Sequence, residues 1–290
     1  MLNYENCRLC PRQCGADRTA GELGYCGMPA QVRVARCAPH FWEEPVLSGN
    51  GGAGAVFFSG CTLGCKYCQN SEISRGGRGR EISSAKLREM LEDLVAQGVQ
   101  CIDLVTPTQF LPEILPALEP KLPVPVVMNC GGYESVETLR QLEGKIDVYL
   151  PDFKYSQGIL AEKLSGAADY PEVCKAAILE MYRQVGPAVV ENGVMKRGVL
   201  LRHLVLPGCV ENSLGVLDWI SENFRSGEIL VSIMSQYTPL GGLEAPFDRT
   251  VTEEEYAAVC SWADLCGIRD GFIQELGSAK AEFVPDWNLF

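Results

Sequence analysis

The sequence predicts an α/β fold: a partial, TIM-like (β/α)6 barrel with a small cysteine-rich, metal-binding segment at its N-terminus. Short apolar runs typical of buried strands alternate with amphipathic segments typical of helices, as in a parallel sheet covered by helices. About six such units fit between residues 55 and 276, too few for a closed eightfold barrel. Eight of the 14 cysteines lie between Cys7 and Cys68, which sets the first part of the chain apart.

The expected strands are short and apolar, and they cover residues 55–58, 101–105, 124–128, 146–150, 199–206 and 229–234. The expected helices carry apolar residues three and four positions apart, and they cover residues 83–97, 110–118, 134–142, 170–185, 212–224 and 253–266. In the first of these helices, Ser84 is suited to cap the start and Gly98 to end the last turn.

We expect two parts on either side of the boundary between residues 47 and 48. Residues 1–47 are rich in cysteines and turn residues and would form the metal-binding segment. A glycine-rich linker at residues 48–54 then leads into the first barrel strand. Residues 48–290 would form the barrel.

Charge and hydropathy exclude several classes of protein. The net charge of −12 argues against a nucleic-acid partner, whose phosphates would be repelled. No apolar run of about 18 residues or more predicts a membrane span. The N-terminus lacks the layout of a signal peptide, so we expect a cytoplasmic protein. There, clustered cysteines favour metal binding or catalysis over disulfides.

A three-cysteine loop, residues 61–68, is the strongest chemical signal in the chain. Cys61, Cys65 and Cys68 follow the first expected strand, at the barrel end where active sites collect. A four-iron cluster normally takes four thiolates, so a loop that supplies three leaves one iron open. A zinc site, or a disulfide with a spare thiol, is the alternative. The spacing and the Gln69-Asn70 that follows argue against both.

This loop resembles the radical S-adenosylmethionine (SAM) superfamily, with Cys-x3-Cys-x2-Cys and an aromatic residue before the third cysteine. The wider block is similar to proteins of the pyruvate formate-lyase activating enzyme type, which are glycyl-radical activases. Other segments share that similarity: the N-terminal cysteine block and residues 147–154, 202–208 and 234–237.

The resemblance implies a partial barrel that holds a [4Fe–4S] cluster and SAM. One electron would cleave SAM to methionine and a 5′-deoxyadenosyl radical, which abstracts hydrogen from a substrate. The substrate would be a glycine of a glycyl radical enzyme. However, residues 49–54 replace the Asp-Gly-Pro-Gly and Arg pattern expected in activating enzymes. Direct radical chemistry on a small molecule or peptide is therefore an alternative, as is an electron-transfer iron–sulfur protein without a substrate.

The resemblance also points to residues around the cosubstrate. Thr106 and Thr108 stand where the superfamily has a Gly-Gly-Glu-like segment, although the acid is missing here and an ordinary turn is the alternative. Asp152 and Lys154 resemble the Asp-x-Lys that lies beside the cosubstrate in activating enzymes, and the ammonium of Lys154 suits a carboxylate. Asn129 follows the third strand and could bind ribose.

Further candidates lie in later strands and ahead of the linker. His203 lies inside an apolar strand and would be either a ligand-binding or a core histidine. Gln236 ends the sixth strand, where it could line the adenine or the substrate. Three residues before the linker could also contact the site: His40, Glu43 and Glu44.

Four N-terminal cysteines have the spacing of a second metal site: Cys7, Cys10, Cys14 and Cys26, with Cys37 as a substitute. Zinc would make it structural, whereas an iron–sulfur cluster would make it an electron relay. A segment of some 40 residues has too small a core to fold without such a staple.

A basic loop follows the three cysteines. Residues 1–90 carry a net charge of +3 and residues 91–290 a net charge of −15. Arg75, Arg78 and Arg80 would form a basic rim for an acidic flavodoxin or ferredoxin, the expected electron donor. The alternative is a solvated flexible loop.

Overall fold

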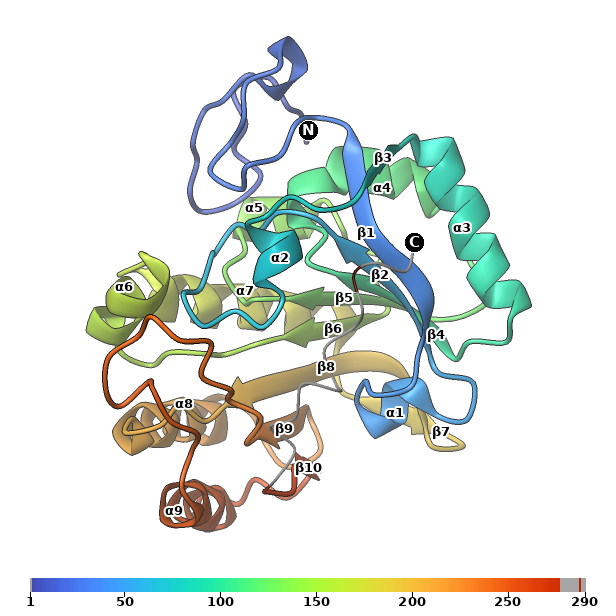
Figure 1. Ribbon diagram of the computed structural model, residues 1–290. Helices are drawn as coiled ribbons and strands as arrows, with labels where there is room; N and C mark the ends of the chain where they lie inside the picture. Colours follow the sequence, from blue (N-terminus) through green and yellow to red (C-terminus); the bar gives the residue numbers. More distant parts are fainter. Residues whose placement is uncertain (1, 277–286, 288–290) are drawn as a thin grey trace.

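The computed structural model describes residues 2–276 and residue 287, and in this part of the chain an open, mostly parallel sheet carries helices on its outer face (Figure 1). The strand order is β10-β9-β8-β6-β5-β4-β2-β1-β3, and β7 pairs with β8. The partial barrel predicted from the sequence is confirmed.

Six parallel strands form the barrel, and each overlaps an expected strand. They are β2 (Ala53–Phe58), β4 (Cys101–Val105), β5 (Val126–Cys130), β6 (Val148–Pro151), β8 (Val194–Leu204) and β9 (Leu230–Met234). A short strand, β10 (Gly271–Ile273), adds to β9 in parallel.

The main helices run between these strands and cover the outer face of the sheet (Figure 1). They are α3 (Ser84–Ala96), α4 (Leu111–Ala117), α5 (Val136–Arg140), α6 (Gly158–Ser165), α7 (Tyr170–Val185), α8 (Val210–Asn223) and α9 (Glu253–Leu265). The cap of α3 is Ser83 and not Ser84, since the Ser83 hydroxyl accepts the Lys86 N–H at 3.1 Å. The sequence missed α6, whose N-cap Gln157 makes no side-chain capping bond.

The sheet also extends into the segment that the sequence assigned to the N-terminal part. Strand β1 (Val32–His40) pairs antiparallel with both β2 and β3 (Arg80–Ile82), and β7 (Val189–Glu191) forms a hairpin with β8. Short helical turns complete the fold: α1 (Pro45–Ser48), α2 (Ser71–Ser74), η1 (Arg18–Ala20) and η2 (Thr108–Phe110).

The barrel interior is layered along the strand direction. At the end where the strands begin, Leu47 of α1 packs with Ala53, Cys101 and Val148 in an apolar plug. Two residues further along β4, β5 and β8, the inward side chains are polar: Asp103, Asn129 and Arg202. In residues 2–276 no helix is both long enough and apolar enough to cross a membrane.

Candidate functional site

The three-cysteine loop leaves β2 at the end of the barrel where the parallel strands finish. Each of its sulfurs lies within reach of a hydrogen-bond donor. The Leu63 N–H is 3.4 Å from Cys61 Sγ and the Ser74 hydroxyl is 3.4 Å from Cys68 Sγ. The Ser165 hydroxyl, at the end of α6, is 3.1 Å from Cys65 Sγ. The loop is therefore braced by a neighbouring helix as well as by its own backbone.

These thiols fit an iron–sulfur cluster by their chemistry. None of the 14 cysteines, all within the described residues, is in a disulfide. Burial raises the pKa of Cys61 to about 12 and also raises that of Cys68, because it removes water from the charged thiolate. Iron would supply the positive partner that a buried thiolate needs. In the described part of the chain no three such side chains are arranged around a single metal ion. A cluster differs in this respect, since each of its cysteines binds a different iron.

A charged network lies in the barrel beneath the loop. Asp152 accepts from Lys154 Nζ at 2.5 Å and from Arg202 Nε at 3.0 Å. All three side chains are only 14–15% exposed. Burial would raise the pKa of Asp152, but Lys154 and Arg202 outweigh it and lower that pKa. The Lys154 ammonium is thus held charged near the cysteines, as required of a group that binds a carboxylate.

Arg202 joins this pair to two more predicted residues. Its guanidinium donates to Asn129 Oδ1 at 2.6 Å and to Glu43 Oε1 at 3.2 Å. The Asn129 amide donates in turn to Glu43 Oε2 at 3.2 Å and to Asp103 Oδ2 at 3.3 Å. The structure therefore brings Asn129, Asp152, Lys154 and Glu43 into one network.

Sequence reasoning did not single out Asp103 or Arg202 as site residues. Asp103 is fully buried, and its Oδ1 has no hydrogen-bond partner in the described structure. Burial and the nearby Glu43 raise the pKa of Asp103 well above its usual value. Burial also raises the pKa of Glu44 to about 7. Asp103 and Arg202 are charged residues inside otherwise apolar strands, and this pattern could have marked them as candidate site residues.

The two threonines after β4 differ in environment. Thr106 has a left-handed backbone, with φ of 57°, and its carbonyl accepts the Gln109 amide at 2.8 Å. Left-handed backbone in a β-branched residue is strained and typical of a functional turn. Thr108 is buried, and its hydroxyl is 2.7 Å from Glu134. The sequence did not single out Glu134. Burial raises the pKa of Glu134 to about 8.

Of the two alternatives for His203, a ligand-binding or a core histidine, the structure places it in the core. Its neighbour Arg202 points into the barrel, so His203 points outward to the helical layer. There it is fully buried, with Nδ1 2.7 Å from the Phe153 carbonyl and Nε2 2.8 Å from the Ser213 hydroxyl. Both ring nitrogens are used, and burial lowers its pKa to about 4. His203 is a neutral core histidine.

Gln236 lies next to the cysteine loop. Its carbonyl accepts the side-chain amide of Gln69, the residue after Cys68, at 2.8 Å. Its own Oε1 accepts from Gln274 Nε2 at 3.1 Å. The end of β9 is thereby tied to the loop at the barrel mouth.

The N-terminal cysteines divide into four that gather and one that does not. Cys37 lies on β1 opposite Val56 and packs against the core cluster that contains Leu91 and Leu94 of α3. It therefore faces the helical layer, and its assignment as a substitute ligand is corrected. The four that lie near one another are Cys7, Cys10, Cys14 and Cys26.

A hollow lies between this segment and the cysteine loop. Its volume is about 410 Å³, and Cys26, Cys61, Lys66 and Arg75 are among the residues that line it. Arg75 is thus the arginine of the basic loop that faces this cavity, whereas Arg78 pairs with Glu72.

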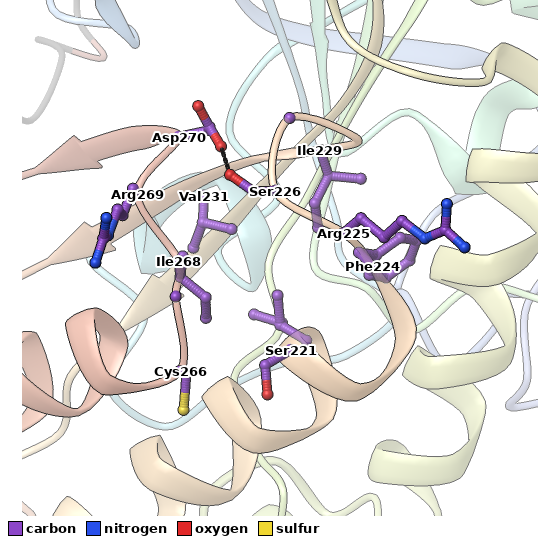
Figure 2. Close-up of a pocket in the computed structure, with 13 residues that line it drawn as sticks. Ser221, Phe224, Arg225, Ser226, Ile229, Val231, Cys266, Ile268, Arg269 and Asp270 are labelled. Atoms are coloured by element: carbon purple, nitrogen blue, oxygen red, sulfur yellow. Dashed lines mark hydrogen bonds between the residues drawn. The ribbon is translucent and has the colours of Figure 1, made fainter.

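A smaller hollow of about 50 Å³ lies where β9 begins, at the opposite end of the strands (Figure 2). Apolar side chains such as Phe224 and Ile268 line it, and Ser226 bonds to Asp270 at its rim. It contains none of the predicted site residues.

The chain was compared with known proteins. Residues 55–185 match the family model of the radical SAM superfamily. An uncharacterized protein of Methanocaldococcus jannaschii is 29% identical over 251 residues, which cover 81% of this chain and 67% of that protein.

Solved structures share the fold at low sequence identity. Streptococcus suis SuiB bound to its precursor peptide SuiA aligns with a TM-score of 0.52 at 12% identity, over 77% of this chain and 48% of SuiB. SuiB bound to S-adenosylmethionine aligns with a TM-score of 0.51 at 13% identity, over 77% of this chain and 50% of SuiB. HydG, a maturase of the [FeFe]-hydrogenase, aligns with a TM-score of 0.52 at 15% identity, over 77% of this chain and 51% of HydG. The chain spans about half the length of these structures.

The matched segment begins in β2 and ends with α7, so it contains the three-cysteine loop together with Asp103, Asn129, Asp152 and Lys154. The cysteine loop and the open parallel barrel agree with the family match, so residues 55–185 of the chain resemble the radical SAM superfamily.

Proposed function

We propose that this chain is a radical SAM enzyme, which uses SAM at Cys61, Cys65 and Cys68 to abstract hydrogen from a substrate held in the barrel. When bound, the [4Fe–4S] cluster supplies the electron that cleaves SAM to methionine and a 5′-deoxyadenosyl radical. The observation that carries the proposal is the charged network directly beneath the three-cysteine loop.

In this proposal the chain's own residues position SAM. The Lys154 ammonium is held charged by Asp152 and attracts the methionyl carboxylate. Asn129 and Thr106 present polar groups at the ends of neighbouring strands, β5 and β4. Arg202 fixes Asp152 and Asn129 relative to each other, so these contacts are set before SAM binds.

We propose flavodoxin or ferredoxin as the electron donor. The cavity that reaches Cys61 is bordered by Lys66 and Arg75, two basic side chains in an acidic protein. An acidic donor protein would be attracted to this face, and the attraction would be screened by salt.

The proposed substrate is a glycine of a glycyl radical enzyme, on the basis of the resemblance of the cysteine block to activating enzymes. The test incubates the reduced protein with SAM and a glycyl radical enzyme deuterated at glycine Cα. Activation predicts a glycyl radical signal in electron paramagnetic resonance (EPR) spectra and deuterium in the 5′-deoxyadenosine. SAM cleavage without either signal would refute this substrate.

The acidic barrel interior favours a second candidate, radical chemistry on a small cationic molecule or peptide. The carboxyls of Glu43, Glu44 and Asp103 line the interior, and one oxygen of Asp103 is without a partner in the described structure. A cationic or hydrogen-bonding substrate would satisfy these groups. A cell-extract component that stimulates 5′-deoxyadenosine formation should then bind a cation-exchange resin, and stimulation confined to the unbound fraction would count against it.

A further inference from the structure

The segment before β1 brings four thiols together. A Cβ built on Gly24 would lie 3.3 Å from Cys14 Sγ and 3.6 Å from Cys26 Sγ, so Gly24 sits between these two sulfurs. The Arg18 side chain lies 3.8 Å from the same point, and its Nη1 is 3.9 Å from Cys7 Sγ. Cys10 lies between Cys7 and Cys14 in the sequence, and its carbonyl accepts the Gln13 N–H at 3.0 Å. The four thiols therefore gather in one part of the segment, and all are free.

The segment before β1 is held mainly by polar contacts, among them those of the buried Arg18 to the Met28 carbonyl at 3.0 Å and the Gln109 carbonyl at 2.6 Å. Its regular structure is the single turn η1, and its own apolar cluster consists of Tyr4, Cys7 and Leu9 with two partly buried neighbours. Backbone turns shape it instead: the Gly15 N–H donates to the Cys7 carbonyl at 3.0 Å. A segment with so small a core needs a covalent or metal staple, and it contains no disulfide.

Arg12 fastens the segment to the three-cysteine loop. Its guanidinium donates to the carbonyls of Thr62 and Leu63, both at 3.1 Å, and to that of Ser165 at 2.9 Å. It also lies 4.0 Å from the ring centroid of Tyr25. Since Arg12 lies between Cys10 and Cys14 in the sequence, it holds the four-cysteine group against the loop that contains Cys61, Cys65 and Cys68.

At Gly60 the backbone of Cys26 lies against the start of the three-cysteine loop. A Cβ there would lie 2.8 Å from the Cys26 carbonyl oxygen and 2.3 Å from Met28 Cγ, so only glycine permits this approach. Its φ of +80° is also a conformation that favours glycine. Gly60 directly precedes Cys61, and Cys26 and Cys61 line the same cavity with Lys66 and Arg75. A metal centre at the four cysteines would therefore adjoin the first cluster.

We propose that Cys7, Cys10, Cys14 and Cys26 hold a second iron–sulfur cluster, and that this cluster relays electrons to the one at Cys61, Cys65 and Cys68. Four thiolates close a cluster and leave no iron for SAM. A reduced flavodoxin or ferredoxin gives the second cluster one electron, which then passes to the first, and no bond is made or broken. Structural zinc is the alternative, but no three of the described cysteine, histidine or acidic side chains are arranged around a single metal ion.

The second cluster is tested without the first. A triple variant, Cys61→Ala, Cys65→Ala and Cys68→Ala, keeps the N-terminal site and removes the radical chemistry. After anaerobic reconstitution it should retain iron and acid-labile sulfide and, once reduced by dithionite, give an EPR signal that SAM does not change. Zinc without iron, or no bound metal, would overturn the proposal whether or not the proposed function holds.

The relay, which rests on the proposed function, is tested by Cys14→Ser, with Cys209→Ser as the matched control. Cys14 is an exposed cysteine of the four, and Cys209 begins α8 away from them. Cys14→Ser should lose the second signal and flavodoxin-driven SAM cleavage but keep dithionite-driven cleavage, while Cys209→Ser keeps both. Equal effects on the two reductants, whether both activities survive or both are lost, would overturn the relay.

Discussion

Replacement of Arg202 by methionine should destabilise the protein far more than loss of an exposed arginine. Arg202 bonds to Asp152, Glu43 and Asn129, and its side chain is 15% exposed. Removing one partner of a buried ion pair leaves uncompensated charge and typically costs about 3–5 kcal/mol. For a chain of this size that corresponds to a fall in melting temperature of roughly 5–15 °C.

The matched control is Arg249→Met. Arg249 pairs with Glu255, but its side chain is 42% exposed, and such pairs contribute about 1 kcal/mol or less. Thermal unfolding of both variants would be followed by circular dichroism under anaerobic conditions at one scan rate. The Arg202→Met deficit should shrink at acidic pH, because burial would raise the pKa of Asp152 but Lys154 and Arg202 lower it, and a protonated Asp152 no longer needs a cation. Equal deficits in the two variants would refute the reasoning.

Three further predictions follow from single contacts. Ser165→Ala should lower the midpoint potential of the cluster, because the hydroxyl near Cys65 Sγ stabilises the reduced state. An EPR-monitored redox titration measures this potential, with Ser221→Ala as the control. An unchanged potential in Ser165→Ala would contradict the prediction. Lys154→Ala should weaken SAM binding by about 1.5–3 kcal/mol, or roughly 10- to 150-fold in Kd, with the iron content unchanged; an unaltered Kd would remove Lys154 from the site. Glu134→Gln should flatten the dependence of melting temperature on pH between about 4.5 and 8. A carboxyl whose pKa is raised on folding stabilises the protein at low pH, and this contribution is lost as pH rises through the folded-state pKa. A parallel shift of the whole curve of melting temperature against pH would contradict this prediction.

The barrel could be predicted because its signal is local. Each apolar strand and each amphipathic helix can be recognised from the pattern of a few neighbouring residues, and the three cysteines lie within eight positions. Strand β1 was missed because Arg33 and Arg36 interrupt its apolar residues. Its pairing with β2 and β3, which cannot be seen in its own sequence, stabilises it as a strand.

The candidate site could be predicted only in part, because the direction of a side chain depends on how the strands pair in the assembled sheet. Arg202 and His203 are adjacent, and the sequence alone does not decide which of them points into the barrel. Asp103 was hidden in an apolar strand, and its importance emerges only when Asn129 and Glu43 lie beside it. Contacts between residues far apart in sequence cannot be read from local pattern.

The central claim is tested most directly by SAM cleavage in the reduced, anaerobically reconstituted protein. The account predicts that dithionite and SAM yield 5′-deoxyadenosine and methionine with the wild-type chain. Cys65→Ala should form none and lose about four irons per chain, since two thiolates do not hold the cluster stably. Full cleavage activity and unchanged iron content in Cys65→Ala would contradict the account.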